Sequence, residues 1–153
     1  MLTLECISFQ YSQQAPALHE VSLELKADDF MALAGHNGSG KTTLTRLIMG
    51  LIKPTGGRIL LDDEDLARHS TAQRARHIGY VFQNPDRQIF RDTVALEVAY
   101  GPQQLGFSAA ETSEAVAKAL QAVSLSDQAQ ADPRLLPKGL KQRVAIASAL
   151  AMK

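Results

Sequence analysis

The chain begins with two segments in which apolar and polar residues alternate. Residues 2–11 and 18–25 follow this period of two, which is typical of strands that bury one face. The turn-forming sequence SQQAP, residues 12–16, separates them. The pattern therefore predicts a pair of antiparallel strands at the N-terminus.

Two later segments are apolar without alternation. Residues 30–34 read FMALA and residues 78–82 read IGYVF. A continuous apolar run of this length is expected of a strand that is buried on both faces, as in a parallel sheet. We therefore predict two buried strands at these positions.

A helical spacing follows the first apolar run. From Lys41 onward, apolar residues recur at i, i+3, i+4 and i+7, which predicts a helix with one buried face. The residues of this face are Leu44, Leu47, Ile48 and Leu51. Gly50 and then Pro54 are expected to end the helix.

The rest of the chain alternates short strands and helices. Ser108 and Glu111 have the spacing of a capping box, which predicts a helix to about Val123 with Val116 and Leu120 facing inward. The other expected elements are a short strand and turn at 56–66, a helical turn at 71–76, and helices at 93–103 and 140–152. A buried strand, then a helix, then further strands and helices predicts an α/β fold with parallel strands.

Composition restricts the possible classes of function. The chain has 153 residues, and its sixteen basic and sixteen acidic residues balance, so nothing favours a nucleic-acid or anionic-membrane partner. A single cysteine, Cys6, excludes an internal disulfide framework and fits a reducing compartment. No apolar run approaches the ~20 residues that span a bilayer, and the start lacks the layout of a signal peptide. We expect a soluble, cytosolic protein.

The joint between the first buried strand and its helix carries the candidate chemistry. Residues 35–43 read GHNGSGKTT, and Gly35, Gly40, Lys41 and Thr42 fit the pattern G-x-x-x-x-G-K-[ST]. Glycines at 35, 38 and 40 allow positive φ and close approach of the backbone, so that successive N–H groups form an anion-binding nest at the start of the helix. This arrangement predicts a polyphosphate ligand.

Each polar residue of the loop has an expected role. Lys41 is expected between the β- and γ-phosphates, the Thr42 hydroxyl on Mg²⁺, and Thr43 at the α-phosphate. The alternative is a glycine-rich turn that merely starts a helix. The preceding strand and the following helix are the context that the motif requires, so nucleotide binding is the preferred interpretation.

Four segments together resemble a known family. They are GHNGSGKTTL, GLIKPTGGRILLDDEDL, IGYVFQNPDRQIF and LKQRVAIASALAM, and in this order they cover nearly the whole chain. The sequence resembles the nucleotide-binding subunits of ATP-binding-cassette transporters. It is most similar to those of energy-coupling-factor and cobalt-type importers, which tend to carry an Asn-Pro-Asp-x-Gln sequence where this chain has residues 84–88.

The resemblance implies a fold and a division of the chain. The fold is α/β, with a P-loop NTPase-like core, an N-terminal antiparallel β subdomain, a helical segment and an incomplete parallel sheet. We expect one partial nucleotide-binding domain over residues 1–153. Its expected parts are an antiparallel β part (1–29), a phosphate-loop core (30–83), a mostly helical segment (84–135), and a signature-like element with its helix (136–153).

The resemblance also assigns site residues. Tyr11 matches the aromatic ring that stacks on adenine, and strand alternation places it on the same side as Phe9. From spacing alone, a tyrosine that simply covers the sheet is as good an interpretation of Tyr11 as a ring that stacks on adenine. Gln83 matches the glutamine that touches Mg²⁺ and the attacking water, and the loop after it faces the membrane partner. Without its neighbours, Gln83 would be interpreted as a glutamine that starts a polar loop.

The complete set of expected ligand contacts covers the loop and these two residues. ATP is expected to contact Tyr11, Gly35, His36, Asn37, Gly38, Ser39, Gly40, Lys41, Thr42 and Thr43, Mg²⁺ to contact Thr42 and Gln83, and Gln83 to be the catalytic residue. His36 is interpreted as a spacer, because the family uses mainly backbone at that position. The four histidines of the chain show no metal-ligand spacing.

The signature element of the family is altered in this chain. Its usual sequence is Leu-Ser-Gly-Gly-Gln, where the serine and backbone N–H groups clasp the γ-phosphate held by a second subunit. Residues 136–140 read Leu-Pro-Lys-Gly-Leu, and Pro137 has neither a hydroxyl nor an N–H group. The charge of Lys138 has two interpretations. It either compensates in part for the groups that Pro137 lacks or, as we prefer, belongs to a solvated surface lysine.

The next family element is a strand that ends in Asp-Glu, followed later by a histidine, and the sequence stops one step before that strand. The segment RILLDDEDL, residues 58–66, imitates such a strand, but it matches the outer antiparallel strand and turn of the family instead. Asp63 stands where the family usually has a turn glycine, and aspartate can adopt the left-handed geometry of such a turn. We therefore expect this chain to be a fragment or a truncated product with weak autonomous stability, exposing Val144, Ile146 and Leu150 of its last helix.

Three functions remain open. The first is an ATP-binding subunit of an importer for metal ions or vitamins, with a transmembrane subunit and a second ATPase subunit as partners, peripheral on the inner face of the membrane. The second is a soluble, non-transport ATPase of the family, which would be expected to carry basic tracts or charged insertions. The third is a nucleotide-binding module that does not hydrolyse ATP. No nucleic-acid partner is expected.

Overall fold

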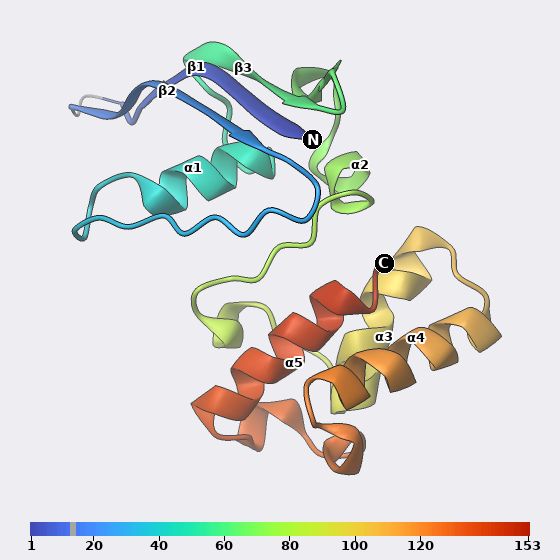
Figure 1. Cartoon of the computed structure of the whole chain (residues 1–153). Coiled ribbons are helices and arrows are strands. Elements are labelled where there is room, and N and C mark those ends of the chain that lie inside the picture. The colour runs from blue at the N-terminus through green and yellow to red at the C-terminus, as the bar shows by residue number, and fades with distance from the viewer. Residues whose placement is uncertain (13–14) are drawn as a thin grey trace. The chain divides into compact units, whose positions relative to one another are not determined.

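The computed structural model describes residues 1–12 and 15–153, which form two compact units. Unit 1 comprises residues 1–78 and unit 2 comprises residues 79–153 (Figure 1). The predicted turn at 12–16 includes residues 13 and 14, which lie outside the described residues. Each unit has its own hydrophobic core and is described separately.

Unit 1 is built on an antiparallel sheet. Its strands are β1 (Leu2–Gln10), β2 (Pro16–Leu25), β3 (Gly56–Leu61) and β4 (Glu64–Asp65), and their order among the described residues is β2-β1-β3-β4. All three strand pairs are antiparallel. The predicted N-terminal strand pair is confirmed, and so is the outer strand and turn at residues 56–66.

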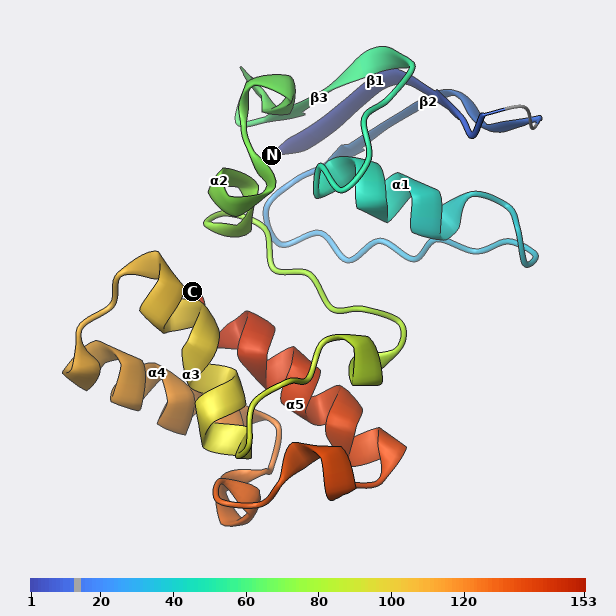
Figure 2. The same cartoon turned by 180° about the vertical axis from the view of Figure 1, so that it is seen from behind.

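Helix α1 (Lys41–Ile48) packs against the sheet, and both views show it along one face (Figures 1 and 2). The buried residues of this core are Leu4, Ile7, Phe9, Leu18, Leu44, Leu47, Ile59 and Leu66. The inward position of Leu44 and Leu47 is confirmed, whereas that of Leu51 is wrong, since Leu51 is 44% exposed. The helix ends before Leu51 because Gly50 has left-handed geometry, with φ of 72°.

The two predicted buried strands, 30–34 and 78–82, do not form in this structure. Neither segment has strand hydrogen bonding, and the described residues contain no parallel strand pair. Phe30 is 98% exposed, and Val81 and Phe82 are also exposed. The prediction failed because an apolar run shows a preference for burial, whereas a strand also needs a neighbouring strand to complete its hydrogen bonds.

Two short helices follow the sheet in unit 1. They are the 3-10 helix η1 (Leu66–Arg68) and helix α2 (Thr71–Ala75), which confirms the predicted helical turn. The Ser70 hydroxyl accepts a hydrogen bond from the Gln73 N–H, and the Gln73 side chain accepts one from the Ser70 N–H. This capping box fixes where α2 begins.

Unit 2 is helical. Its helices are α3 (Val94–Leu105), α4 (Ala109–Ala122) and α5 (Lys138–Leu150), with 3-10 turns η2 (Pro85–Arg87), η3 (Ser126–Gln128) and η4 (Pro133–Leu135). Figure 2 shows the three long helices side by side. Their shared core contains Val94, Val98, Ala119, Leu120, Leu125, Val144, Ala147 and Ala151. The Ser108–Glu111 capping box of α4 is confirmed.

The last helix differs in part from the prediction. It begins at Lys138 rather than near Leu140. Ile146 and Leu150 are exposed as expected, but Val144 is fully buried, because α3 and α4 cover that side of the helix. Across residues 1–12 and 15–153, none of the helices combines the length and the hydropathy that crossing a lipid bilayer requires.

Candidate nucleotide-binding site

Residues 35–40 form a loop that leads directly into α1, whose first turn holds residues 41–43. Gly38 and Gly40 have left-handed geometry, with φ of 86° and 87°. The first helical hydrogen bond runs from the Leu44 N–H to the Gly40 carbonyl, at 2.9 Å. The N–H groups of residues 41–43 therefore have no acceptor within the helix, and they lie at its positive end.

Close packing restricts two of the loop glycines. A Cβ atom at Gly40 would lie 2.6 Å from the Ala17 carbonyl oxygen. A Cβ atom at Gly35 would lie 2.6 Å from the Ser39 Oγ atom. Gly40 thus needs a residue without a side chain because of its contact with the β2 backbone, whereas a side chain at Gly35 would have to displace the Ser39 hydroxyl.

The Lys41 ammonium group lies over its own loop. The Nζ atom donates to the carbonyl oxygens of Gly35 and His36, each at 2.8 Å, and to the Ser39 Oγ atom at 3.1 Å. The His36 ring contacts the Asn37 carbonyl oxygen, and both residues are exposed. One cation and the amides of the first helical turn are therefore gathered at the same end of α1.

The two hydroxyls after Lys41 differ in their surroundings. Thr42 is exposed, whereas Thr43 is buried. The Thr43 Oγ1 atom lies 3.2 Å from the Tyr11 hydroxyl oxygen, within hydrogen-bond distance. This contact joins the helix that follows the loop to the residue predicted to stack on adenine, and sequence spacing gave no sign of it.

Tyr11 follows β1 and packs beside Phe9. Their ring centroids are 4.8 Å apart and the rings are nearly perpendicular, with an interplanar angle of 89°. The expectation that the two rings lie on one side is confirmed. Phe9 is buried and Tyr11 is half-buried, so Phe9 holds the tyrosine ring from the core side.

The acidic residues 62–65 lie in the turn between β3 and β4 and in β4 itself. Among the described residues, no group of three or more His, Cys, Asp or Glu side chains has the geometry to hold a metal ion. Asp62 pairs with the N-terminal amino group, and Asp63 has left-handed geometry, with φ of 66°. The structure therefore supports the interpretation of residues 58–66 as an outer strand and turn.

Gln83 belongs to unit 2 and is exposed. The loop around it is ordered by side-chain caps: the Asn84 Oδ1 atom accepts from the Asp86 N–H, and the Gln88 Oε1 atom accepts from the Phe82 N–H. Since residues 35–43 belong to unit 1, the roles predicted for Gln83 at the phosphates stay predictions.

The loop after Gln83 is joined to α5 by an ion pair. The Lys141 Nζ atom lies 2.7 Å from Asp86 Oδ1, and the lysine side chain is mostly buried. Lys141 is three residues into the helix that carries the signature-like element. Unit 2 thus contains a direct polar link between the loop and this helix, which the sequence analysis did not predict.

Glu97 orders the segment that leads into α3. Its side chain is 4% exposed, and its Oε2 atom accepts from the Phe90 N–H at 2.9 Å and the Arg91 N–H at 2.8 Å. The Arg91 guanidinium carbon lies 5.2 Å from the Phe90 ring centroid and 4.7 Å from that of Tyr100. Both rings thus stabilise the cation through their faces.

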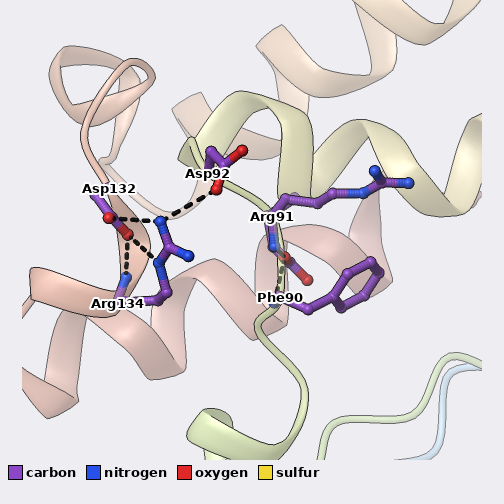
Figure 3. Close-up of polar contacts among 6 residues, drawn as sticks. Phe90, Arg91, Asp92, Asp132 and Arg134 are labelled. Atoms are coloured by element: carbon purple, nitrogen blue, oxygen red, sulfur yellow. Dashed lines mark hydrogen bonds and ion pairs between the residues drawn. The ribbon is translucent and has the colours of Figure 1, made fainter.

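A second ion-pair group lies beside this segment. Figure 3 shows Arg134 between the carboxylates of Asp132 and Asp92, with contacts of 2.8 and 3.1 Å. Hydrogen bonds from the Arg134 side chain and backbone N–H hold the pKa of the Asp132 carboxyl below its ordinary value. The group connects the turn before the signature-like element to the start of α3.

The signature-like element starts α5 without a side-chain cap. Pro137 is the N-cap residue, with φ of −54° and ψ of 150°, and the N–H groups of Leu140 and Lys141 donate to its carbonyl oxygen. Lys138 is exposed, which is consistent with a solvated lysine. The helix that follows the altered signature is therefore intact.

Comparison with known proteins decides the family. A family model described as ABC transporter matches residues 18–153. The chain belongs to the ABC transporter family. It spans between 24% and 58% of the length of curated ABC relatives that it matches. One relative is the energy-coupling factor transporter ATP-binding protein EcfA1 of Symbiobacterium thermophilum, 42% identical over 99% of this chain and 56% of that protein.

Solved ABC structures agree with this fold. The structure of cbiO1 from Clostridium perfringens, described as part of the ABC transporter complex cbiONQ, matches with a TM-score of 0.87 and 33% identity, over 99% of this chain and 61% of that one. The ATP-binding cassette MJ0796, bound to ADP and Pi, matches with a TM-score of 0.85 and 30% identity, over 99% and 69%. These matches confirm the predicted P-loop NTPase-like α/β fold.

Proposed function

We propose that this chain is the ATP-binding part of an energy-coupling-factor or cobalt-type importer of the ABC family. The main observation in support is the geometry of residues 35–43, in which left-handed glycines bring free helix amides and the Lys41 ammonium together. Similarity to an EcfA1 protein and to cbiO1 supports the importer type. The cargo is proposed to be a metal ion or a vitamin.

ATP binding would use the loop and Tyr11. The N–H groups of the loop and of residues 41–43 would donate to phosphate oxygens, and Lys41 would exchange its bonds to loop oxygens for bonds to the β- and γ-phosphates. Tyr11 would stack on the adenine ring while its hydroxyl contacts Thr43. Thr42, which is exposed, and Gln83 would hold Mg²⁺, which when bound neutralises phosphate charge.

Coupling to transport is proposed for the loop after Gln83. Gln83 would respond to bound nucleotide, and the ordered segment of Phe90 and Arg91 would face a transmembrane subunit. The Asp86–Lys141 ion pair would transmit movement of the loop to the signature-like helix. A second ATPase subunit would close on this one, and the complex would lie on the inner face of the cell membrane.

The alternative function is a nucleotide-binding module that does not hydrolyse ATP. The specific observation in its favour is Pro137, which places neither a hydroxyl nor an N–H group at the signature position. Because the signature serine and backbone N–H groups of the family hold the γ-phosphate, we expect their loss at Pro137 to leave residues 1–153 with negligible phosphate release.

Calorimetric titration with Mg-ATP tests the binding site. Lys41→Ala should lower ATP affinity by about tenfold or more, because charge-assisted bonds to phosphate are lost. Lys53→Ala is the matched control, since Lys53 is an exposed lysine of the same unit, and it should leave the affinity unchanged. Equal ATP affinity in the wild type, Lys41→Ala and Lys53→Ala would contradict the proposed site.

Two further measurements separate the functions. Co-purification with a transmembrane subunit would favour the importer over a soluble, non-transport ATPase of the family. Mg²⁺-dependent phosphate release from purified residues 1–153 would contradict the non-hydrolysing alternative. Nucleotide binding without phosphate release would support it for this polypeptide.

A further inference from the structure

Thr43 places a hydroxyl group on the buried face of α1. It lies on the same helix face as Leu47, four residues later, and the two residues are 7% and 0% exposed. Thr42, one residue earlier, is exposed. Of the two adjacent threonines, Thr42 is therefore open to solvent, whereas Thr43 belongs to the side of the helix that packs against the core.

The hydroxyl of Thr43 finds its partner in a distant part of unit 1. Its Oγ1 atom lies 3.2 Å from the Tyr11 hydroxyl oxygen, and either hydroxyl can donate the hydrogen bond. Buried polar groups are nearly always paired, and leaving one unpaired costs free energy. Since Tyr11 also packs against the hydrophobic core of unit 1, this contact connects the first turn of α1 to the end of β1.

The Tyr11 side chain is held at two points. Its ring packs against Phe9, with centroids 4.8 Å apart, and its hydroxyl contacts Thr43. The pairing of β1 with β2 ends one residue earlier, at the pair of Gln10 and Pro16. A tyrosine side chain has two χ angles, and contacts at the ring and at the hydroxyl restrict both. A ring that is ordered before a ligand arrives loses less conformational entropy on binding.

We propose that Thr43 is a positioning residue, whose hydroxyl orients the Tyr11 ring for stacking on the base of a nucleotide. This role rests on the proposed nucleotide function. The contact expected between Thr43 and the α-phosphate is then made by the backbone N–H of Thr43, which has no acceptor within the helix, and the hydroxyl stays with Tyr11. The Thr43 side chain thus favours a complete nucleotide over a polyphosphate chain that lacks a base.

Two ligands separate the base from the phosphates. Mg-ATP carries both, whereas inorganic tripolyphosphate with Mg²⁺ carries three phosphates alone. Thr43→Val keeps the branched shape but lacks the hydroxyl. In calorimetric titrations of residues 1–153 it should lower the affinity for ATP by about three- to tenfold, the range of one hydrogen bond, and leave the affinity for tripolyphosphate unchanged. A Thr43 hydroxyl that bound phosphate directly would make both affinities fall.

Tyr11→Phe removes the same contact from the other side and keeps the aromatic ring. It should lower the ATP affinity by a similar factor, and Thr43→Val should cause no further loss in the Tyr11→Phe background. Thr43→Ser retains a hydroxyl and should restore the ATP affinity. Thr71→Val is the matched control, since Thr71 is an exposed threonine of the same unit, and it should leave both affinities unchanged.

Far-UV circular dichroism and the thermal midpoint would verify that each variant folds. Should Thr43→Val not fold, Tyr11→Phe tests the contact alone, and an unchanged ATP affinity in that variant would overturn the positioning role. Equal effects of Thr43→Val on ATP and tripolyphosphate would also overturn it, as would additive losses in the double variant, while the proposed nucleotide function would stand. A wild type that binds neither ligand would refute the proposed function and the positioning role together.

Discussion

At the residue scale, Arg74 is the clearest case of a buried charge with a structural role. It is 8% exposed, and its guanidinium donates to the carbonyl oxygens of Leu47, Ile48, Leu66 and His69. Burial lowers the pKa of this guanidinium, and the charge of Asp65 opposes that shift. A single side chain therefore satisfies the carbonyl groups at the ends of α1 and η1.

Replacing Arg74 should strongly destabilise the chain. Arg74→Met keeps apolar bulk but removes a donor from four carbonyl groups, of which those of Leu47 and Leu66 keep a backbone donor. We expect a loss of about 2–4 kcal/mol in the free energy of unfolding. Urea unfolding measures this loss. Arg76→Met is the control, because Arg76 is exposed and its loss should cost less than about 0.5 kcal/mol. Similar values for the two variants would contradict the capping role.

Gly40 should tolerate no side chain. Gly40→Ala would place a Cβ atom 2.6 Å from the Ala17 carbonyl at a φ of 87°, and we expect a loss of stability of about 1–3 kcal/mol, together with weaker ATP binding. Gly139→Ala is the control, since Gly139 lies in α5 with no atom within 4 Å of the added carbon. It should stabilise by about 0.5–1 kcal/mol. Equal thermal shifts in both variants would refute this distinction.

The sequence predicts conformation where the motif is local and misses contacts where partners are distant. The glycines of residues 35–40 lie in one loop, so their spacing was sufficient to predict the left-handed geometry at Gly38 and Gly40. The Tyr11–Thr43 and Asp86–Lys141 contacts join residues that are far apart in the chain, and a single sequence carries no signal for such pairs. Glu97 was also missed, because an acidic residue in the first turn of a helix is ordinary.

At the scale of elements, caps were predicted better than strands. Ser108 and Glu111 gave the start of α4 directly, because a capping box depends on residues three apart. Residues 30–34 and 78–82 were predicted as strands although no strand pairs with them in the structure. Periodicity therefore defines an element well when all its hydrogen bonds are internal, and poorly when they depend on other segments.

The Ser108–Glu111 capping box should make α4 sensitive to acid. Hydrogen bonds from the Ser108 side chain and backbone lower the pKa of the Glu111 carboxyl. A lowered pKa means that Glu111 stabilises the fold above its unfolded-state pKa, and that this contribution is lost as the pH falls through the lowered folded-state pKa. Urea unfolding between about pH 7 and about pH 3 should show this loss in the wild type.

Glu111→Gln provides the comparison for this pH dependence. The glutamine retains an oxygen that accepts from the Ser108 N–H but does not titrate. Its unfolding free energy should therefore decline less than that of the wild type as the pH falls. Parallel pH curves for the two proteins would show that the Glu111 carboxylate contributes nothing through its ionisation.

Glu97 should hold the segment before α3 in place. Glu97→Ala removes the acceptor for the Phe90 and Arg91 N–H groups, and we expect those two amides to exchange hydrogen faster by about tenfold or more. Native-state hydrogen exchange by NMR measures this effect. Glu114→Ala, at an exposed helix position, should leave both rates unchanged. Unchanged rates in Glu97→Ala would contradict the anchoring role.

At the scale of the whole molecule, the chain divides between residues 78 and 79 into two units with separate cores. The predicted division into four parts, within one partial domain, stays a prediction. Motif order was enough to predict the fold class, because the four family-like segments cover nearly the whole chain in order. The predicted parallel strands at 30–34 and 78–82 were wrong for the described residues, since a strand also needs hydrogen bonds from a neighbouring segment.

Limited proteolysis should detect the exposed apolar segments. Phe30 and Phe82 are exposed and lie outside helices and strands, whereas Phe9 is buried in β1. Brief chymotrypsin treatment should therefore cut after Phe30 and Phe82 well before Phe9, and intact-mass spectrometry would identify the fragments. Early cleavage after Phe9 would contradict the burial of β1.

The hydrogen bonds that Lys41 makes within its own loop have a consequence for selectivity. Its ammonium group already has three oxygen partners. A ligand therefore gains binding free energy at Lys41 only to the extent that its own oxygens bind the ammonium group more strongly than the oxygens that they displace. Anionic phosphate oxygens outcompete neutral carbonyls, whereas adenosine brings no charge to the exchange. Under the proposed function, the loop rejects unphosphorylated nucleosides by competition within the protein, without any steric barrier.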